Sequence, residues 1–177
     1  MADLASRLVL TSADIASVGV DVVVSDASDG LVPPDGTASI IHRAAGPRLR
    51  EALGKIGRCE PGTAVVTAGF DLPARLVIHA VGPAWRGGAC GEASTLAACY
   101  RATLELALAR DAETLAMPPI ASGVLRYPPR PAALVAVRET CAILRRFPRP
   151  SRVLFCCAAT ADWSAYAHAV QQLYAHP

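Results

Sequence analysis

Short, mostly apolar runs alternate along the chain with longer segments in which apolar residues recur at helical spacing. A short apolar run is typical of a strand buried on both faces, and longer helical segments between such runs indicate a largely parallel sheet covered by helices. We therefore predict an α/β fold, a three-layer α/β/α sandwich around a mixed, mostly parallel sheet of about six strands. The expected strands are Leu8–Leu10, Val20–Ser25, Ala64–Thr67, Leu76–Val81, Thr114–Met117 and Val153–Cys157.

The segments between these strands are predicted to be helices. Gly46 and Pro47 interrupt the first helical segment, because proline cannot donate within a helix but suits a fresh first turn. We expect helices from Thr37 to a bend at Gly46 and Pro47, from Arg48 to Ile56, from Glu92 to Arg110, from Ala132 to Arg146 and from Asp162 to Ala175.

Two proline-rich stretches, Pro33–Gly36 and Tyr127–Pro131, lie at strand-to-helix junctions and are predicted to be loops. Ligands of open α/β sheets bind beyond the carboxyl ends of the strands. Both loops are therefore candidate parts of a binding site.

Size and composition favour one domain over residues 1–177. The chain has 177 residues, 53% of them apolar, which is enough to bury a substantial core. We see no internal repeat and expect a monomer. Charged residues make up 18% and the formal net charge is +2, so no basic surface for nucleic acid is indicated.

The chain carries no signal for export or membrane insertion. Its first residues, MADLASRLVL, place Asp3 and Arg7 within a short apolar stretch, and no uninterrupted apolar run of about 18 residues follows. We expect a cytoplasmic protein without a membrane partner.

The six cysteines do not predict a metal site. They show no Cys-x-x-Cys pair and no histidine at metal-site spacing. Cys156 and Cys157 lie in an apolar run, where neighbouring strand residues face opposite sides, so we interpret both as core thiols in a reducing compartment.

Three ordered blocks of the sequence resemble the macrodomain family. The first is VDVVVSDAS, similar to a family strand ending in Asn-Ala-Ala-Asn, which continues into DGLVPPDGTASIIHRAAGP, where the family has glycines and a helix ending in Ile-His-x-Ala-Ala-Gly. The second is EPGTAVVTAGFDLPARLVIHAVGPAW, close to the family consensus. The third is MPPIASGVLRYP, similar to Phe-Pro-x-Ile-Ser-Thr-Gly-Val-Tyr-Gly-Tyr-Pro. Such ordered blocks are far more specific than one short motif.

The resemblance implies a macrodomain fold with a cleft for ADP-ribose, free or attached to a protein, or for a related adenine nucleotide. It implies no cofactor. Members with the complete motif remove ADP-ribose from acidic side chains or deacetylate O-acetyl-ADP-ribose. Fold and function are separate claims, so the function depends on the residues at the site positions.

At the adenine end, Asp14 and the following Ile15 stand where the family places an aspartate that accepts a hydrogen bond from the adenine amino group. An aspartate after a strand also commonly caps a turn, which is the alternative role. Trp163, at the start of the last helix, falls near the family's adenine-stacking aromatic; core packing explains a tryptophan there equally well.

At the ribose end, Ser25 and Ser28 stand where the family motif has two asparagines, the second of which contacts the distal ribose. A serine hydroxyl is shorter than an amide and has one donor instead of two. Asp26 lies between the serines, and because successive strand residues face opposite ways it need not share the direction of Ser28.

The acidic residue that hydrolytic members use to activate water is also replaced. The matching position is Ala38, which cannot act as a base. Asp35 lies three residues earlier and is a weak candidate for a substitute base, as Ser28 is for positioning. The alternative role of Asp35 is to cap the helix that begins near Thr37.

The phosphate loops have changed unequally. The glycine loop is replaced by Pro33, Pro34, Asp35 and Gly36. The two prolines remove two backbone donors, and Asp35 adds a negative charge beside the negatively charged diphosphate. The opposite loop is better kept, with Arg126 in place of a glycine and Leu125 in place of an aromatic. Arg126 either contacts phosphate or pairs with Asp35 and closes the groove. The loop's expected ligand contacts are Ser122, Gly123, Val124, Leu125, Arg126 and Tyr127.

His42, His79 and Cys59 match family positions that we interpret as structural. The leading hypothesis is a binding module for ADP-ribose or a related adenine nucleotide without efficient hydrolysis. The alternatives are an ADP-ribosyl hydrolase or O-acetyl-ADP-ribose deacetylase, against which Ser28 and Ala38 weigh, and a scaffold that has lost nucleotide binding.

Overall fold

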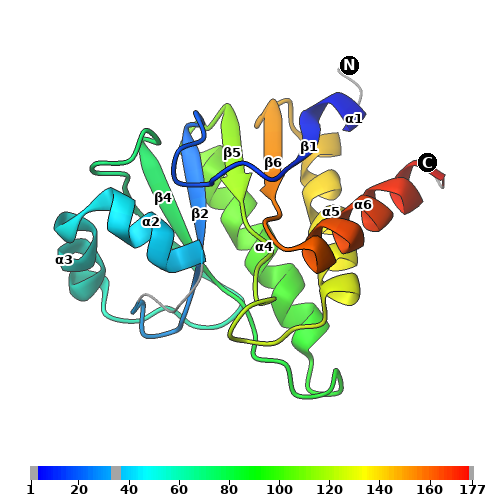
Figure 1. The fold of residues 1–177 in the computed structure, drawn as a ribbon, viewed down its shortest axis with the longest axis horizontal. Helices are drawn as coiled ribbons and strands as arrows, with labels where there is room; N and C mark the ends of the chain where they lie inside the picture. Colours follow the sequence, from blue (N-terminus) through cyan, green and yellow to red (C-terminus); the bar gives the residue numbers. More distant parts are fainter. Residues whose placement is uncertain (1–3, 33–36, 176–177) are drawn as a thin grey trace.

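A six-stranded sheet forms the centre of the computed structural model, which describes residues 4–32 and 37–175 (Figure 1). The strand order is β1-β6-β5-β2-β4-β3, and every neighbouring pair is parallel except β3 and β4. The mixed, mostly parallel sheet predicted from the sequence is confirmed. The strands are β1 Leu8–Thr11, β2 Val22–Ala27, β3 Ala64–Ala68, β4 Leu76–Val81, β5 Thr114–Met117 and β6 Arg152–Cys156.

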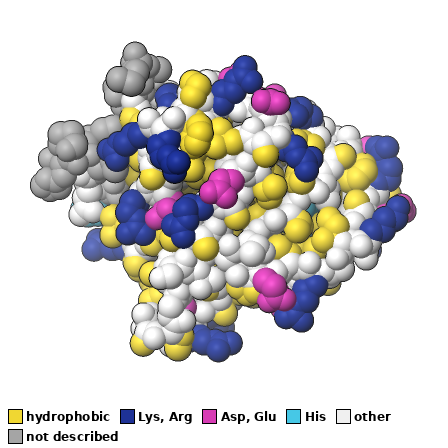
Figure 2. Space-filling view, turned by 180° about the vertical axis from the view of Figure 1, so that it is seen from behind, with side chains coloured by type: hydrophobic (Ala, Val, Ile, Leu, Met, Phe, Trp, Pro, Cys, Tyr) yellow, Lys and Arg dark blue, Asp and Glu magenta, His cyan; other side chains and the backbone are white. Residues whose placement is uncertain are grey.

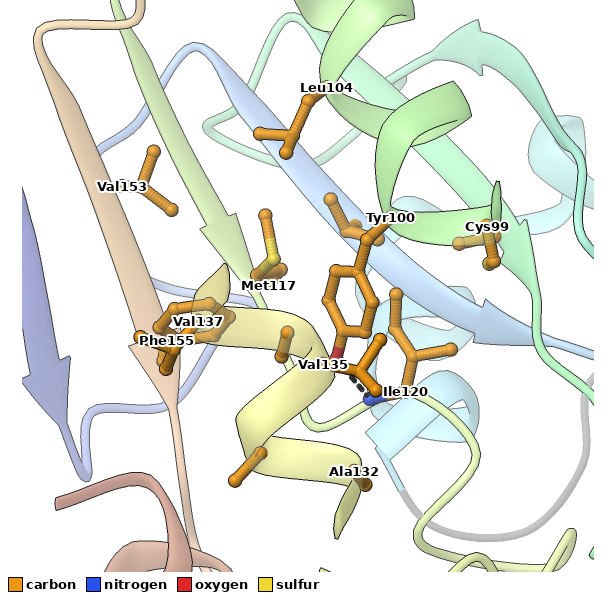
Figure 3. Packing of buried hydrophobic residues seen from close by; sticks show 14 of the residues in the cluster. Cys99, Tyr100, Leu104, Met117, Ile120, Ala132, Val135, Val137, Val153 and Phe155 are labelled. Atoms are coloured by element: carbon orange, nitrogen blue, oxygen red, sulfur yellow. Dashed lines mark hydrogen bonds between the residues drawn. The ribbon is translucent and has the colours of Figure 1, made fainter. Parts of the chain in front are cut away.

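Helices cover both faces of the sheet and bury two apolar clusters against it (Figure 1). The cluster under α4, α5 and α6 includes Tyr100, Met117 and Phe155 (Figure 3), and the cluster under α2 and α3 includes Ile41 and Leu49. This is the predicted α/β/α sandwich. The helices are α1 Leu4–Arg7, α2 Thr37–Ala45, α3 Pro47–Ile56, α4 Glu92–Ala109, α5 Pro129–Arg146 and α6 Thr160–Ala175.

Strand β2 lies two residues later than predicted, at Val22–Ala27 instead of Val20–Ser25. Asp21 explains the late start: its carboxylate accepts the backbone N–H groups of Glu113 and Thr114 at 2.8 and 2.9 Å, and its own N–H donates to the Thr114 hydroxyl. The strand then pairs with β4 from Val22 to Ala27.

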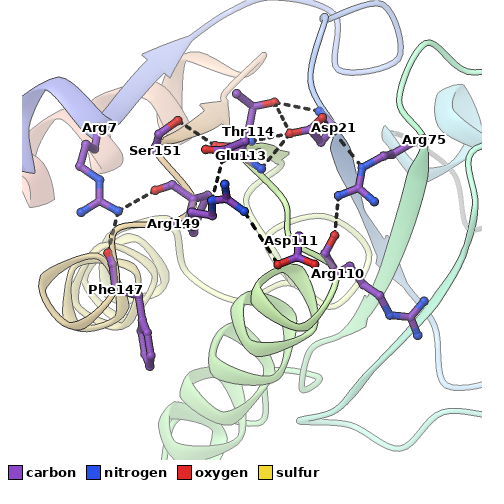
Figure 4. Close-up of polar contacts among 11 residues, drawn as sticks. Arg7, Asp21, Arg75, Arg110, Asp111, Glu113, Thr114, Phe147, Arg149 and Ser151 are labelled. Atoms are coloured by element: carbon purple, nitrogen blue, oxygen red, sulfur yellow. Dashed lines mark hydrogen bonds and ion pairs between the residues drawn. The ribbon is translucent and has the colours of Figure 1, made fainter.

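Helix α5 begins at Pro129, so the predicted loop Tyr127–Pro131 is too long and the predicted start at Ala132 too late. Prolines in a first turn cost no hydrogen bond, because the N–H groups there have no partner within the helix. The short helix α1 was not predicted. Its Arg7 donates to the carbonyls of Phe147 and Pro150 at 2.9 and 2.7 Å, which fixes it to the end of α5 (Figure 4).

Polar contacts close the amino-terminal edge of the sheet (Figure 4). Arg149 pairs with Glu113 at 2.7 Å, and Arg75 reaches Asp21 at 3.9 Å. The carboxyl-terminal edge of β2, β5 and β6 is the one that opens into a cleft.

The face formed by α4 and α5 has mixed charge (Figure 2). Basic side chains lie in separate groups over its described residues, with acidic side chains and apolar patches between them. None of the helices within residues 4–32 and 37–175 combines the length and apolar composition needed to cross a bilayer.

Candidate functional site

A cleft of about 350 Å³ lies at the carboxyl ends of three adjacent parallel strands, β6, β5 and β2. The starts of α2 and α6 complete its walls. This is where an open α/β sheet binds ligands. The lining residues are Asp26, Ala27, Ser28, Ala38, Pro118, Pro119, Ser122, Gly123, Val124, Leu125, Cys156, Ala158, Ala159 and Asp162.

The loop between β5 and α5 forms one wall and is held from below by two buried tyrosines. The Ile120 N–H donates to the Tyr100 hydroxyl at 3.1 Å (Figure 3), and that hydroxyl is 2.9 Å from the hydroxyl of Tyr166. Both rings are fully buried. Because Tyr100 belongs to α4 and Tyr166 to α6, this contact fixes the loop to two helices.

The far end of the loop is held by its own backbone and by Trp85. Ala121 and Arg126 have φ angles of 66° and 57°, and the Tyr127 N–H donates to the Ala121 carbonyl at 2.9 Å. The backbone N–H of Trp85 donates to the Leu125 carbonyl at 2.9 Å, and the ring centroids of Trp85 and Tyr127 lie 4.7 Å apart. The loop is therefore shaped by contacts outside the cleft.

Between these anchors, the backbone N–H groups of Ser122, Gly123, Val124 and Leu125 have no acceptor within the described parts of the chain. Ala158 and Ala159, just before α6, line the same cleft. Unbonded loop amides next to a helix N-terminus provide donors and a partial positive charge for an anion.

Two acidic side chains also line the cleft. Burial raises the pKa of Asp26 to about 7, although the Ala121 N–H donates to its carboxylate. Burial also raises the pKa of Asp162, against the effect of a hydrogen bond from Ser122. The Ser122 hydroxyl lies 3.3 Å from the Pro119 carbonyl as well, so it has two alternative acceptors.

Several residues expected at the site do line the cleft. Ser28 lies there with its hydroxyl donating to the Val32 carbonyl at 2.9 Å, and Ala38 lies buried at the start of α2. Four residues of the opposite loop line the other wall: Ser122, Gly123, Val124 and Leu125.

Other expected contacts are outside the described cleft lining. Ser25, Ile15 and Tyr127 are buried, and the Ser25 hydroxyl has no partner within the described residues. Arg126 is exposed, and Trp163 is 39% exposed at the first turn of α6. Pro33, Pro34, Asp35 and Gly36 lie outside the described residues, so the alternatives for Asp35 and its pairing with Arg126 stay predictions.

Asp14 does cap a turn. Its carboxylate accepts the Ala16 N–H at 3.0 Å and its carbonyl accepts the N–H groups of Ser17 and Val18. The side chain is exposed and close enough to the cleft residue Cys156 that its charge contributes, after burial, to raising the pKa of that thiol. The turn therefore places a carboxylate beside the cleft.

Sequence reasoning missed the two cleft carboxyls and the tyrosine support. Asp26 and Ser28 both line the cleft, and Ala27 between them does so too, because β2 ends at Ala27 and the cleft lies at that end. The signal that could have found Asp26 was its place at the carboxyl end of a predicted strand. Asp162 was interpreted only as a helix start, and the pairing of Tyr100 with Tyr166 joins residues too far apart in sequence for a local pattern to show.

The residues interpreted as structural have partners in the interior. The His79 ring lies 2.9 Å from the Thr67 hydroxyl, and burial lowers its pKa to about 3. Cys59 is buried with its sulfur 3.1 Å from the Thr63 hydroxyl. Neither contributes to the cleft lining.

Comparison with known proteins gives consistent matches. A family model described as Macro domain matches residues 24–136. A Macro domain-containing protein of Chlorobaculum tepidum is 42% identical over 158 residues, covering 89% of this chain and 92% of its own. The O-acetyl-ADP-ribose deacetylase of Klebsiella pneumoniae is 46% identical over 148 residues, covering 81% of this chain and 85% of its own.

Solved structures agree with these relatives. The Oceanobacillus iheyensis macrodomain with ADP superimposes with a TM-score of 0.93 at 28% identity, covering 99% of this chain and 96% of that one. The Trypanosoma brucei macrodomain in complex with ADP-ribose gives 0.85 at 29% identity, covering 93% and 69%. With its fold, its cleft and these matches in agreement, this chain belongs to the macrodomain family.

Proposed function

We propose that this chain is a binding module for ADP-ribose or a related adenine nucleotide and that it does not hydrolyse its ligand efficiently. One observation carries the proposal: residues Ser122–Leu125 line the cleft beside the start of α6, and their backbone N–H groups have no acceptor in the described chain. A diphosphate supplies the acceptors that such a row of donors lacks. The ADP and ADP-ribose complexes of structural neighbours support this ligand class.

The adenine end of the ligand would lie toward Asp14. The carboxylate of Asp14 is exposed beside Cys156 and uses Oδ1 to cap the turn. The other oxygen has no hydrogen-bond partner among the described residues and can accept a hydrogen bond from an exocyclic amine. The diphosphate would then lie between the two walls of the cleft.

Two positions argue against efficient hydrolysis. Ser28 donates its hydroxyl to Val32 instead of presenting an amide to the ribose, and Ala38 has no proton-accepting group. Loss of water activation costs about 100-fold or more in rate. The names of the deacetylase relatives favour a second candidate function, hydrolysis of O-acetyl-ADP-ribose, which an assay for acetate release tests directly.

Calorimetry with ADP-ribose up to millimolar concentration tests the binding proposal. In Gly123→Val the new Cβ meets no protein atom within 4 Å, and because Gly123 lines the cleft we expect the added side chain to occupy cleft space without disturbing the fold. We expect affinity to fall about tenfold or more. Gly54→Val, at an equally open position in α3, is the matched control and should bind like the unmodified protein.

Three results distinguish the candidates. Heat release without turnover supports a binding module. Turnover of O-acetyl-ADP-ribose, or of an ADP-ribosylated protein, at the rate of an efficient enzyme would establish the hydrolase instead. No heat at millimolar ligand would refute nucleotide binding and favour a scaffold role.

A further inference from the structure

Asp26 occupies an unusual position in this cleft. It is the penultimate residue of β2 and lines the floor below the loop that follows β5. The Ala121 N–H donates to its carboxylate, but Oδ1 is buried and has no hydrogen-bond partner within the described residues. A buried oxygen left unpaired is costly, and a carboxylate with no cation beside it still more so.

Nothing in the described cleft lining compensates this charge. The lining residues include no arginine, lysine or histidine. Besides Asp26, they include one other carboxyl group, that of Asp162. A diphosphate entering the cleft would therefore meet backbone donors on one wall and an ionised carboxylate on the floor. The repulsion disappears when Asp26 is neutral, and the neutral carboxyl gains an O–H that can donate to a phosphate oxygen.

We propose that Asp26 couples ligand binding to proton uptake: the cleft accepts a phosphate-bearing ligand together with one proton from solvent, which Asp26 holds in the complex. This inference rests on the proposed binding of ADP-ribose and adds a binding residue that selects for the charge of its ligand. A buffer acid gives up the proton, the Asp26 carboxylate forms an O–H bond with it, and no other covalent bond changes.

The acid–base behaviour of Asp26 fits this role. Burial raises its pKa to about 7 in the free protein, and a bound anion would raise it further. Since proton uptake favours binding, affinity is highest below the pKa of the free protein and decreases as the pH rises above it.

The neighbouring ionisable groups do not produce the same pH dependence. On α4, burial raises the pKa values of Cys99 and Tyr100 far above neutral, and on β6 it raises that of Cys156 to about 11. His42 and His79, which belong to the opposite face of the sheet, have pKa values lowered by burial. Among the described residues around the cleft, Asp162 on α6 is the other carboxyl whose pKa is raised, and it needs its own variant.

Calorimetry of ADP-ribose binding at about pH 6, 7 and 8, in buffers of different ionisation enthalpy, tests the proposal. The diphosphate of ADP-ribose stays ionised over this range. For the unmodified protein we expect affinity to fall about tenfold from about pH 6 to about pH 8, with uptake approaching one proton at the upper end. Asp26→Asn should lose this dependence and bind about tenfold more tightly than the unmodified protein at about pH 8.

Two variants control for other carboxyls. Glu51→Gln, on the exposed side of α3, should behave like the unmodified protein, and Asp162→Asn should keep the pH dependence whatever its affinity. The ¹³C chemical shift of the Asp26 carboxyl carbon can be measured by NMR without any substitution. In the free protein this shift should show a titration near neutral pH, and with ligand bound it should stay at the value of the protonated carboxyl group.

Three results would each overturn the inference and leave ADP-ribose binding intact. They are an affinity that does not change with pH, a pH dependence that persists in Asp26→Asn, and a chemical shift showing that the Asp26 carboxyl group is ionised at every pH. Absence of binding by every variant at every pH would refute the proposed function, and proton coupling with it. The two failures are therefore distinguishable.

Discussion

Substitution of Tyr100 by phenylalanine should damage both the stability and the cleft of this protein. The ring is fully buried, and its hydroxyl is the acceptor for the Ile120 N–H and the partner of the Tyr166 hydroxyl. Tyr100→Phe removes one oxygen and leaves two buried polar groups unpaired. At about 1–3 kcal/mol for each, we expect the free energy of unfolding to fall by about 2–6 kcal/mol.

Tyr166→Phe is the matched comparison, because it removes the other hydroxyl of the same pair. Tyr100 then still accepts the Ile120 N–H, so the expected loss is about 1 kcal/mol. Urea denaturation followed by circular dichroism measures both values. Since the loop depends on Tyr100 more than on Tyr166, ADP-ribose affinity should also decrease more in Tyr100→Phe.

The order of the two variants is the decisive result. If Tyr166→Phe destabilised the protein as much as Tyr100→Phe, the Ile120 contact would contribute nothing beyond the tyrosine pair. Equal ligand affinity in both would show that the loop keeps its shape without this support.

Three further substitutions test other parts of the loop and the sheet. Gly82→Ala would place a Cβ 2.8 Å from that of Ala121, so we expect about 1–3 kcal/mol of destabilisation in urea titrations and weaker ADP-ribose binding by calorimetry; unchanged affinity would contradict this reading. Arg126→Gly, at φ 57°, should leave stability within about 1 kcal/mol and weaken ADP-ribose binding about threefold, whereas tighter binding would indicate that Arg126 closes the groove. Asp21→Asn should lower stability by about 1–2 kcal/mol near neutral pH. Burial raises the pKa of Asp21, but hydrogen bonds from Thr114 and others lower it overall. The contribution of Asp21 to stability is therefore complete above its pKa in the unfolded chain and is lost as the pH falls. A difference in stability between Asp21→Asn and the unmodified protein that stayed constant into acid would refute this prediction.

Local sequence patterns predicted the framework well, and the reason is physical. Strands β4 and β5 lie where their apolar runs predict, because a strand buried on both faces is mostly apolar along its length. The start of β2 was wrong because the hydrogen bonds of Asp21 to Thr114 come from a distant part of the chain. The same limit applies to Tyr100, whose partners depend on the tertiary fold.

The position of Asp26 is a different case, since its place in the chain already contained the signal. Ser25 is buried, while Asp26, Ala27 and Ser28 all line the cleft at the carboxyl end of β2. Considering only whether Asp26 and Ser28 face the same way obscured this arrangement.

A division of roles between backbone and side chains in this cleft is consistent with the proposed function, binding without efficient hydrolysis. The donors at Ser122–Leu125 are backbone N–H groups, whose direction depends on φ angles and on supports such as Tyr100, outside the cleft lining. Substituting a cleft side chain leaves these donors in place. Proton transfer and ribose positioning depend on side chains, and there Ser28, Ala38 and Asp26 differ from the family pattern. Under the proposed function, anion recognition therefore depends on groups that such substitutions leave in place, while hydrolysis does not, and we expect the protonation of Asp26 to set the strength of binding.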